Sequence, residues 1–243
     1  MKADPRGAGF AAVLANVNDI AAMGAVPMGI VDTIATSPEA GRLALAGMRT
    51  AAGLLDVPIV GGHLTAHDGE PAISAFAVGS VTDPALALSV TRAQPGQSLV
   101  VAAATVGTMN ATFPFFRAFE ERGDRCAGDV RLMPRLAREG VVVAAKDISM
   151  AGLVGSLAML LEARGLGVTV DVDAVPAPPT SRSPGGSTAS PASASCCACH
   201  RAARTSASPR SPGATCPRRS SAPWTTPVSS LSDAVTSAVS SCN

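Results

Sequence analysis

Apolar residues recur at helical spacing near the start of the chain, between Ala8 and Ala25. One stripe of this predicted helix comprises Phe10, Val13, Leu14, Val17, Ile20, Ala21 and Gly24. The opposite side is also apolar, as in a buried helix, except for a single carboxylate, Asp19, with the amide of Asn16 three residues earlier. A buried charge needs a partner or a metal. Asp19 therefore either caps or pairs with a structural group, or it binds a metal or a phosphate.

Short apolar blocks and further helical patterns alternate along the chain as far as residue 178. The apolar blocks predict strands over 28–35, 57–60, 72–81, 98–106, 141–145 and 168–172. Helical spacing predicts helices over 38–54, 111–122, 130–139 and 150–164. In the strand at 72–81, one side carries Ser74, Phe76, Val78 and Ser80. This alternation predicts a fold of α/β or α+β layers.

Two consecutive glycines follow the strand at 57–60, in the segment Gly61-Gly62-His63. We expect a sharp turn there, because glycine adopts backbone conformations that other residues avoid. His63 and His67 are of a residue type that binds zinc, but their spacing matches no closed zinc site.

Asp147 lies where the strand at 141–145 gives way to the helix at 150–164. Small residues follow it, and the start of a helix favours an anion, so this is a suitable place for a metal or phosphate ligand. The alternative is that Asp147 or Ser149 only caps the helix.

Composition limits the class of protein. Apolar residues make up 47% of the chain, aromatic residues only 3%, and the formal net charge is +1. This charge gives no support for nucleic acid or a membrane as a partner. No apolar run is long enough to span a membrane, so we expect a soluble cytoplasmic protein. The phosphate-binding GxxxxGK[ST], dinucleotide-binding GxGxxG and hydrolase GxSxG motifs do not occur in the sequence.

The composition changes at Pro179. Residues 179–243 are rich in Ser, Pro, Arg, Ala and Thr, and they contain five of the six cysteines but only one carboxylate, Asp233. Such a segment buries too little apolar surface to offset the entropy lost on ordering. It is either a natural disordered tail or the product of a frameshift in a GC-rich gene. We favour the frameshift, because the ordered pattern stops directly after a predicted strand.

Three motifs occur in a fixed order: NDIAAMGAVP at 18–27, GGH at 61–63, and KDIS at 146–149 followed by AGL at 151–153. Together they resemble the AIR-synthase-like (PurM-like) superfamily over roughly residues 4–178. The resemblance is closest to the AIR-synthase-related proteins of unassigned substrate. Selenophosphate synthetase and thiamine-monophosphate kinase are more distant members.

The resemblance implies an α/β fold with two domains. Residues 1–83 would form a PurM-like N-terminal domain, whose sheet pairs with that of a second subunit into a dimeric barrel. Residues 84–97 would be a linker, and residues 98–178 an incomplete PurM-like C-terminal domain, followed by the tail at 179–243. The expected assembly is a homodimer.

The resemblance also implies ATP and Mg²⁺ as cofactors. Asp19 and Asp147 match the metal-binding aspartates of the family. The residues expected near ATP and its phosphates are Asn16, Asn18, Gly61, Gly62, His63 and Ser149. Phosphoryl transfer asks the protein mainly for positioning and charge neutralisation, so no nucleophile is needed, and no catalytic residue is assigned.

The expected function is therefore that of an ATP- and Mg²⁺-dependent phosphotransferase or synthetase acting on a small molecule. In the family, a glycine-rich segment with GDDA-like aspartates and a strand with another acidic ligand precede the first helix of this chain. Both are missing here. The alternatives are a catalytically inactive nucleotide-binding or dimerisation fragment and a product that never accumulates in a folded form.

Overall fold

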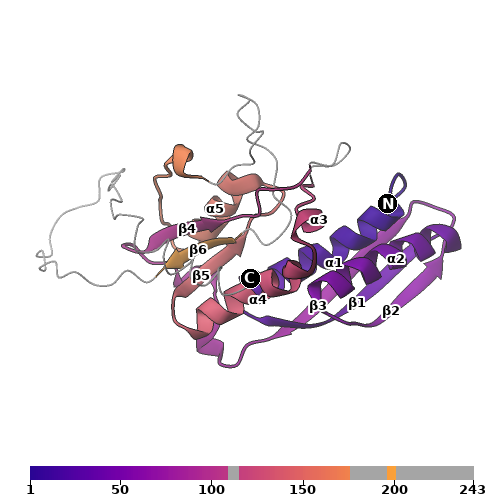
Figure 1. Cartoon of the computed structure of the whole chain (residues 1–243), viewed down its shortest axis with the longest axis horizontal. Coiled ribbons are helices and arrows are strands. Elements are labelled where there is room, and N and C mark those ends of the chain that lie inside the picture. Colours follow the sequence, from indigo (N-terminus) through magenta and orange to yellow (C-terminus); the bar gives the residue numbers. More distant parts are fainter. Residues whose placement is uncertain (109–114, 176–195, 201–243) are drawn as a thin grey trace, which may run out of the picture.

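Helices α1 (Pro5–Ala22) and α2 (Pro38–Leu55) lie side by side on one face of a sheet and form the first lobe of the structure (Figure 1). The computed structural model describes residues 1–108, 115–175 and 196–200. The sheet has the order β2-β1-β3, with β1 (Val26–Thr36) parallel to β2 (Ile59–Ala66) and antiparallel to β3 (Ala72–Ser80). This arrangement confirms the predicted mixed α/β class.

Local signals set both ends of α1. Asp4 is the N-cap residue, its carboxylate accepts a backbone hydrogen bond at 2.7 Å, and Pro5 occupies the first helical position. The helix therefore begins earlier than the sequence predicted. At its other end Gly24 has a φ of 74°, and the Ala25 N–H donates to the Ile20 carbonyl at 3.2 Å. This Schellman arrangement ends the helix before Ala25, the predicted end.

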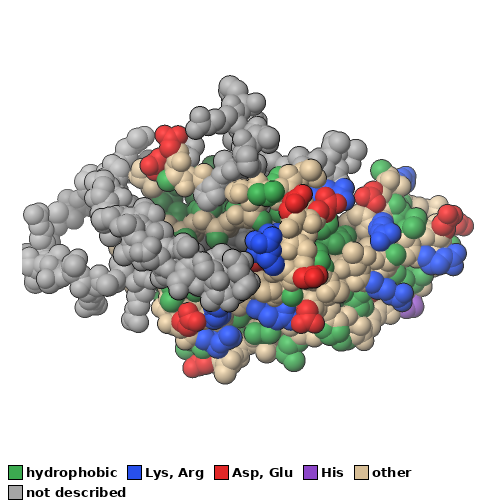
Figure 2. All heavy atoms as spheres, viewed as in Figure 1, with side chains coloured by type: hydrophobic (Ala, Val, Ile, Leu, Met, Phe, Trp, Pro, Cys, Tyr) green, Lys and Arg blue, Asp and Glu red, His purple; other side chains and the backbone are tan. Residues whose placement is uncertain are grey.

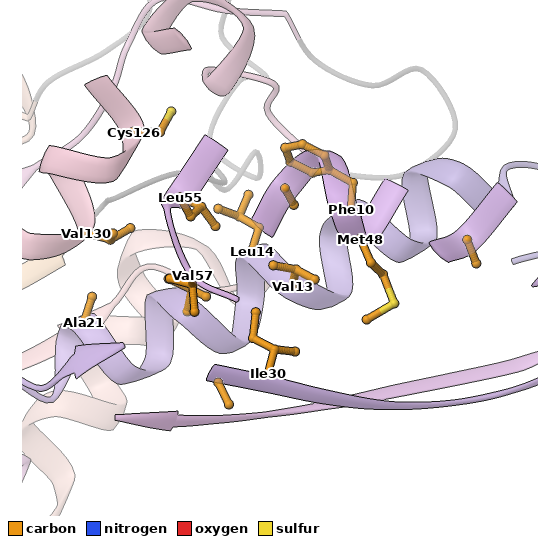
Figure 3. Packing of buried hydrophobic residues seen from close by; sticks show 14 of the residues in the cluster. Phe10, Val13, Leu14, Ala21, Ile30, Met48, Leu55, Val57, Cys126 and Val130 are labelled. Carbon is orange, nitrogen blue, oxygen red and sulfur yellow. The ribbon is translucent and has the colours of Figure 1, made fainter. Parts of the chain in front are cut away.

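Glycines allow α1 and α2 to pack closely. A Cβ atom on Gly9 would lie 2.0 Å from the Ala44 carbonyl oxygen, and one on Gly47 would lie 1.9 Å from the Arg6 carbonyl oxygen. The core lies between these helices and the sheet, and Figure 3 shows part of it: Phe10, Val13, Leu14, Ile30, Met48 and Leu55. Burial of these apolar side chains is the main force that holds the helices on the sheet.

The segment Gly61-Gly62-His63 is not the turn that the sequence predicted. It lies inside β2 and pairs with residues 31–33 of β1. A Cβ atom on Gly62 would lie 2.5 Å from Oδ2 of Asp32. The glycine therefore makes room for a neighbouring side chain, and strand pairing carries the chain straight through the predicted turn.

The face of this sheet that is turned away from α1 and α2 is called the open face below. Its apolar side chains remain exposed in the described part of the chain: Val31, Val60, Phe76 and Val78. In β3 the outward residues are Ser74, Phe76, Val78 and Ser80, as the sequence predicted. One face of a sheet with antiparallel strands can be exposed to water. A large exposed apolar patch on such a face, however, marks an interaction surface.

A second sheet, with the order β4-β6-β5, forms the other lobe (Figure 1). Its strands are β4 (Ser98–Ala102), β5 (Val142–Asp147) and β6 (Cys196–His200), and β6 is antiparallel to both neighbours. The helices are α3 (Phe119–Arg122), α4 (Cys126–Arg138) and α5 (Gly152–Glu162). Short 3₁₀ turns are η1 (Pro84–Leu86), η2 (Val90–Arg92), η3 (Gly123–Arg125) and η4 (Val172–Ala174).

The second lobe departs from the prediction at three places. Residues 168–172 were predicted to be a strand, but they form none and run into the turn η4, because no strand among the described residues pairs with them. The helix predicted over 111–122 lies partly outside the described residues, and of its described residues 115–122 the last four form the short α3. Within the predicted tail at 179–243, the described residues are those of β6, between β4 and β5.

Contacts from α4 join the lobes. Arg131 donates to the Leu55 carbonyl at 3.1 Å, to the Asp56 carbonyl at 2.8 Å and to the Asp56 carboxylate at 2.9 Å. A guanidinium is favourable at the C-terminus of a helix such as α2, where the carbonyl dipoles converge. The rings of Phe10 and Phe119 pack with their centroids 4.1 Å apart. The second lobe is therefore held against both helices of the first.

Charges of both signs are interspersed over the side of the molecule that carries α2 and α4 (Figure 2). This side shows no large patch of a single sign. Among the described residues, every helix is too short or too polar to cross a membrane.

Candidate functional site

The two predicted metal ligands, Asp19 and Asp147, lie together in the structure. Asp19 belongs to the last turns of α1, where its carbonyl accepts from the Met23 N–H at 3.2 Å. Asp147 is the last residue of β5, the strand of the second lobe that contacts α1. The carboxyl group of Asp147 lies close enough to that of Asp19 to raise its pKa. Residues far apart in sequence thus form one acidic site at the junction of the lobes.

Lys146 completes this cluster. Its Nζ forms an ion pair with Oδ1 of Asp147, and both side chains are mostly buried, with 24% and 15% of their surface exposed. Asp19 also experiences the positive field of Lys146. One ammonium group against two carboxylates leaves the cluster with net negative charge. The C-terminal end of α1 adds the negative end of a helix dipole.

The protonation of Asp19 reflects these surroundings. Desolvation raises the pKa of Asp19 above its ordinary value, and repulsion from Asp147 raises it further. Attraction to Lys146 lowers the pKa in part. Two carboxyl groups this close resist ionising together unless a cation joins them.

Neither Asp147 nor Ser149 caps the helix that follows. The N-cap residue of α5 is Ala151, and its end has no side-chain capping hydrogen bond. The Ser149 N–H donates instead to Oγ of the buried Ser156 at 3.1 Å. The structural alternative that the sequence left open for Asp147 is therefore wrong.

The side chains of the two predicted asparagines differ in their hydrogen bonding. The Asn16 amide donates to the Ala12 carbonyl of its own helix at 2.9 Å. The amide oxygen of Asn18 is buried, and it has no hydrogen-bond partner among the residues that the structure describes. Both lie on α1 close to Asp19.

The remaining predicted residues lie elsewhere. Gly61, Gly62 and His63 belong to β2, whereas Ile20, next to Asp19, packs over Gly79 of β3. Strand β1 separates β2 from β3. The structure therefore brings Asp19, Asp147 and Ser149 to one region and leaves the Gly61–His63 segment at the opposite edge of the sheet.

Sequence reasoning missed Asp32, a carboxylate of β1 that is only 8% exposed. It has no hydrogen bond or ion pair within the described part of the chain, and its burial raises its pKa. It lies beside Gly62, where a side chain would collide with it. The period of two in β1 places Asp32 on the side of Ile30 and Ile34, so the strand pattern could have revealed it.

A hollow of about 310 Å³ lies where α1 and α2 begin. It is lined mainly by residues of the chain start, of the β1–α2 junction and of the loop after β2, including Lys2, Thr36 and His67. None of the predicted site residues lines it. The acidic cluster, and not this hollow, carries the chemistry that a metal requires.

The cluster fits Mg²⁺ in part. The described residues contain no group of three or more His, Cys, Asp or Glu side chains placed to hold a metal ion. Mg²⁺ is commonly bound through one or two carboxylates together with waters and substrate phosphates. Asp19 and Asp147 supply such a pair, with oxygen ligands of the kind that Mg²⁺ prefers.

Comparison with known families identifies the chain. The family model "AIR synthase related protein, N-terminal domain" matches residues 1–81, and "AIR synthase related protein, C-terminal domain" matches residues 95–191. The chain belongs to this AIR-synthase-related, PurM-like family, which confirms the resemblance seen in the motifs.

One relative is an uncharacterized protein of Synechocystis sp., 34% identical over 178 residues, which are 72% of this chain and 54% of the relative. Thermotoga maritima PurL complexed with ATP has the same fold, with a TM-score of 0.64, 21% identity, and coverage of 79% of this chain and 32% of PurL. AaThiL complexed with AMPPCP and TMP gives a TM-score of 0.63, 19% identity, and coverage of 81% and 69%. The chain spans about half the length of the uncharacterized relatives it matches.

Proposed function

We propose that the chain provides the metal- and nucleotide-binding part of an ATP- and Mg²⁺-dependent phosphotransferase or synthetase that acts on a small molecule in the cytoplasm. The observation that carries the proposal is the contact between Asp19 and Asp147 across the two lobes. Two relatives of the same fold, PurL and AaThiL, were solved with ATP and with AMPPCP. PurL was also solved with FGAR, a small molecule.

In this proposal Asp19 and Asp147 hold the metal. Bound Mg²⁺ neutralises phosphate charge, which is the main requirement of phosphoryl transfer. The chain's own part is to position the two carboxylates rigidly, one on a packed helix and one at the end of a strand. Ser149, Asn16 and Asn18 flank these carboxylates and stay our candidates for contacts to the nucleotide.

We further propose that the open face pairs with a second copy of the chain. His63 pairs with Thr33 of β1, which also pairs with Ser74 of β3, and Ser74 is exposed on the open face. The next row of paired residues contains Val31 and Phe76, which is 64% exposed. An apolar face of this kind is suited to association. It would bring the Gly61–His63 segments of both copies to their common interface.

An inactive nucleotide-binding or dimerisation fragment is the second candidate. The observation in its favour is that the described residues supply two carboxylates to the metal site and no third ligand of the same kind. A site with fewer charged ligands binds the metal more weakly.

Substitution of Asp19 tests the proposal. We expect Asp19→Asn to abolish binding of Mg·AMPPCP in calorimetric titrations, because a neutral amide is a weaker Mg²⁺ ligand than a carboxylate. The Asp19→Asn variant should still unfold cooperatively on heating, because Asp19 lies outside the core cluster. The matched control is Asp124→Asn, an exposed carboxylate of η3.

Equal Mg·AMPPCP affinity in Asp19→Asn and the parent protein would refute the role assigned to Asp19. Magnesium-dependent ATP consumption by the parent protein would favour the enzyme. Nucleotide binding without turnover would favour the inactive module instead.

A further inference from the structure

Lys146 occupies an unusual place for a strand residue. Consecutive residues of a strand ordinarily point to opposite faces, yet Lys146 reaches round to pair with Asp147, the next residue of β5. The pair is mostly buried. By contrast, the chain's other lysine, Lys2, pairs with Glu70 through side chains that are 67% and 83% exposed. The buried pair is therefore part of the acidic cluster and not a surface contact.

Lys146 is the positively charged group beside the two carboxylates of the cluster. Lys146 forms an ion pair with Asp147, its positive charge acts on Asp19, and the end of α1 adds negative potential. Asp147 is mostly buried and Asp19 is exposed, and two carboxylates held this close favour a cation beside them. In the described residues, the only positive group that influences Asp19 appreciably is Lys146.

We infer that the Lys146 ammonium is the resident counter-ion of the Asp19–Asp147 pair, and that a divalent cation binding to the pair displaces it. This inference rests on the proposed function, because it assumes that the pair is the metal site. The two positive charges of a divalent ion neutralise both carboxylates, so the ammonium is no longer needed as a counter-ion. The displaced ammonium is then an unpaired positive charge beside the metal, where the phosphates of a nucleotide carry the complementary charge.

Two consequences distinguish this role from a purely structural ion pair. Lys146 competes with the metal when the metal binds alone, so its removal tightens metal binding. Lys146 also links metal and phosphate binding, since phosphate stabilises the displaced ammonium. A lysine that only stabilised the fold would neither compete with the metal nor link metal binding to phosphate binding.

The first experiment is a titration with Mn²⁺ alone, followed by the water-proton relaxation that bound Mn²⁺ enhances. We expect Lys146→Met to bind Mn²⁺ on the order of fivefold more tightly than the parent, and Lys146→Arg to bind it like the parent. Lys2→Met is the matched control and should leave the Mn²⁺ affinity unchanged. Added tripolyphosphate should tighten Mn²⁺ binding more in the parent than in Lys146→Met. Equal or weaker Mn²⁺ binding by a Lys146→Met protein that unfolds cooperatively would overturn the inference.

The second experiment needs no substitution. The chain has only two lysines, so reductive methylation with ¹³C-formaldehyde labels two lysine side chains and keeps their charge. Addition of Mg²⁺ should shift the Lys146 dimethylamine signal and leave that of Lys2 in place. Saturation with Mg²⁺ without movement of the Lys146 signal would contradict displacement.

The two failures are separable. If Asp19→Asn binds Mn²⁺ as well as the parent does, the proposed metal site is wrong. If Asp19→Asn loses Mn²⁺ binding while Lys146→Met gains none, the site stands and only the role of Lys146 is wrong.

Discussion

The two faces of the β2-β1-β3 sheet are both apolar, but only one of them is covered. On the covered face, Ile30 and Ile34 lie fully buried beneath α1 and α2. On the open face, Phe76 is 64% exposed and Val78 is 52% exposed. Strands that are apolar on both sides are typical of sheets buried on both sides. Among the described residues, therefore, helices cover one face of this sheet and leave the other exposed, which is the basis of the proposed pairing with a second copy.

The largest expected effect is on the covered face. Ile34→Ala should lower the free energy of unfolding by about 2–5 kcal/mol, because it leaves a cavity in a packed core. On the open face, Val78→Ala should change it by less than about 0.5 kcal/mol in dilute protein, since the side chain is already in water. Chemical denaturation of both variants measures the difference. Similar losses for the two would mean that the open face is already covered in the isolated chain.

A charge on the open face tests association. Phe76→Asp should weaken self-association by on the order of 10- to 100-fold in dissociation constant, because a carboxylate would be buried at the interface. Analytical ultracentrifugation over a range of concentrations measures it. Glu39→Ala, at the exposed start of α2, is the control and should leave the association state unchanged. A parent protein that stays monomeric at high concentration would rule out the proposed second copy.

The smallest expected effect concerns Asp32, the one carboxylate on the covered face. Below its ordinary pKa of 3.8, the group is protonated in the folded and unfolded states alike. As the pH rises above this value the unfolded state ionises first, because burial raises the pKa of the folded state. The parent therefore loses stability relative to Asp32→Asn as the pH rises through this range.

At pH 7 we expect Asp32→Asn to be more stable than the parent by on the order of 1 kcal/mol, and at pH 3 to be equal to it. Denaturant midpoints at the two pH values measure this. Asp68→Asn, on the exposed loop after β2, is the control and should not be more stable than the parent at either pH. A less stable Asp32→Asn at pH 7 would show that the carboxylate has a favourable partner.

The elements that sequence reasoning placed correctly are those with local signals. The stripe of α1 depends on residues within a few turns of one another. The outward set of β3 follows from alternation alone. Strands were harder to place, because a strand exists only if another strand pairs with it. Pairing with β1 extended β2 through Gly61-Gly62-His63, and no strand in the described part of the chain pairs with 168–172.

The candidate site shows the same division. Asp19 and Asp147 attracted notice as isolated carboxylates in apolar or glycine-rich surroundings, and their motifs pointed to a family that the comparisons confirm. Their role as metal ligands stays a prediction. The proximity of Asp19 and Asp147, the ion pair of Lys146 and the burial of Asp32 all depend on the packing of separate elements. The spacing of residues along the sequence does not predict such contacts.

By itself, then, the sequence determined the apolar stripe of α1, the alternation of β3 and the residue types available for a metal. These properties act over a few residues, so a linear pattern records them. The tertiary structure decided which carboxylates meet, which cation stands beside them and which face of the first sheet stays open. Those outcomes depend on how α1, β1 and β5 pack together, and packing joins residues that the chain keeps far apart.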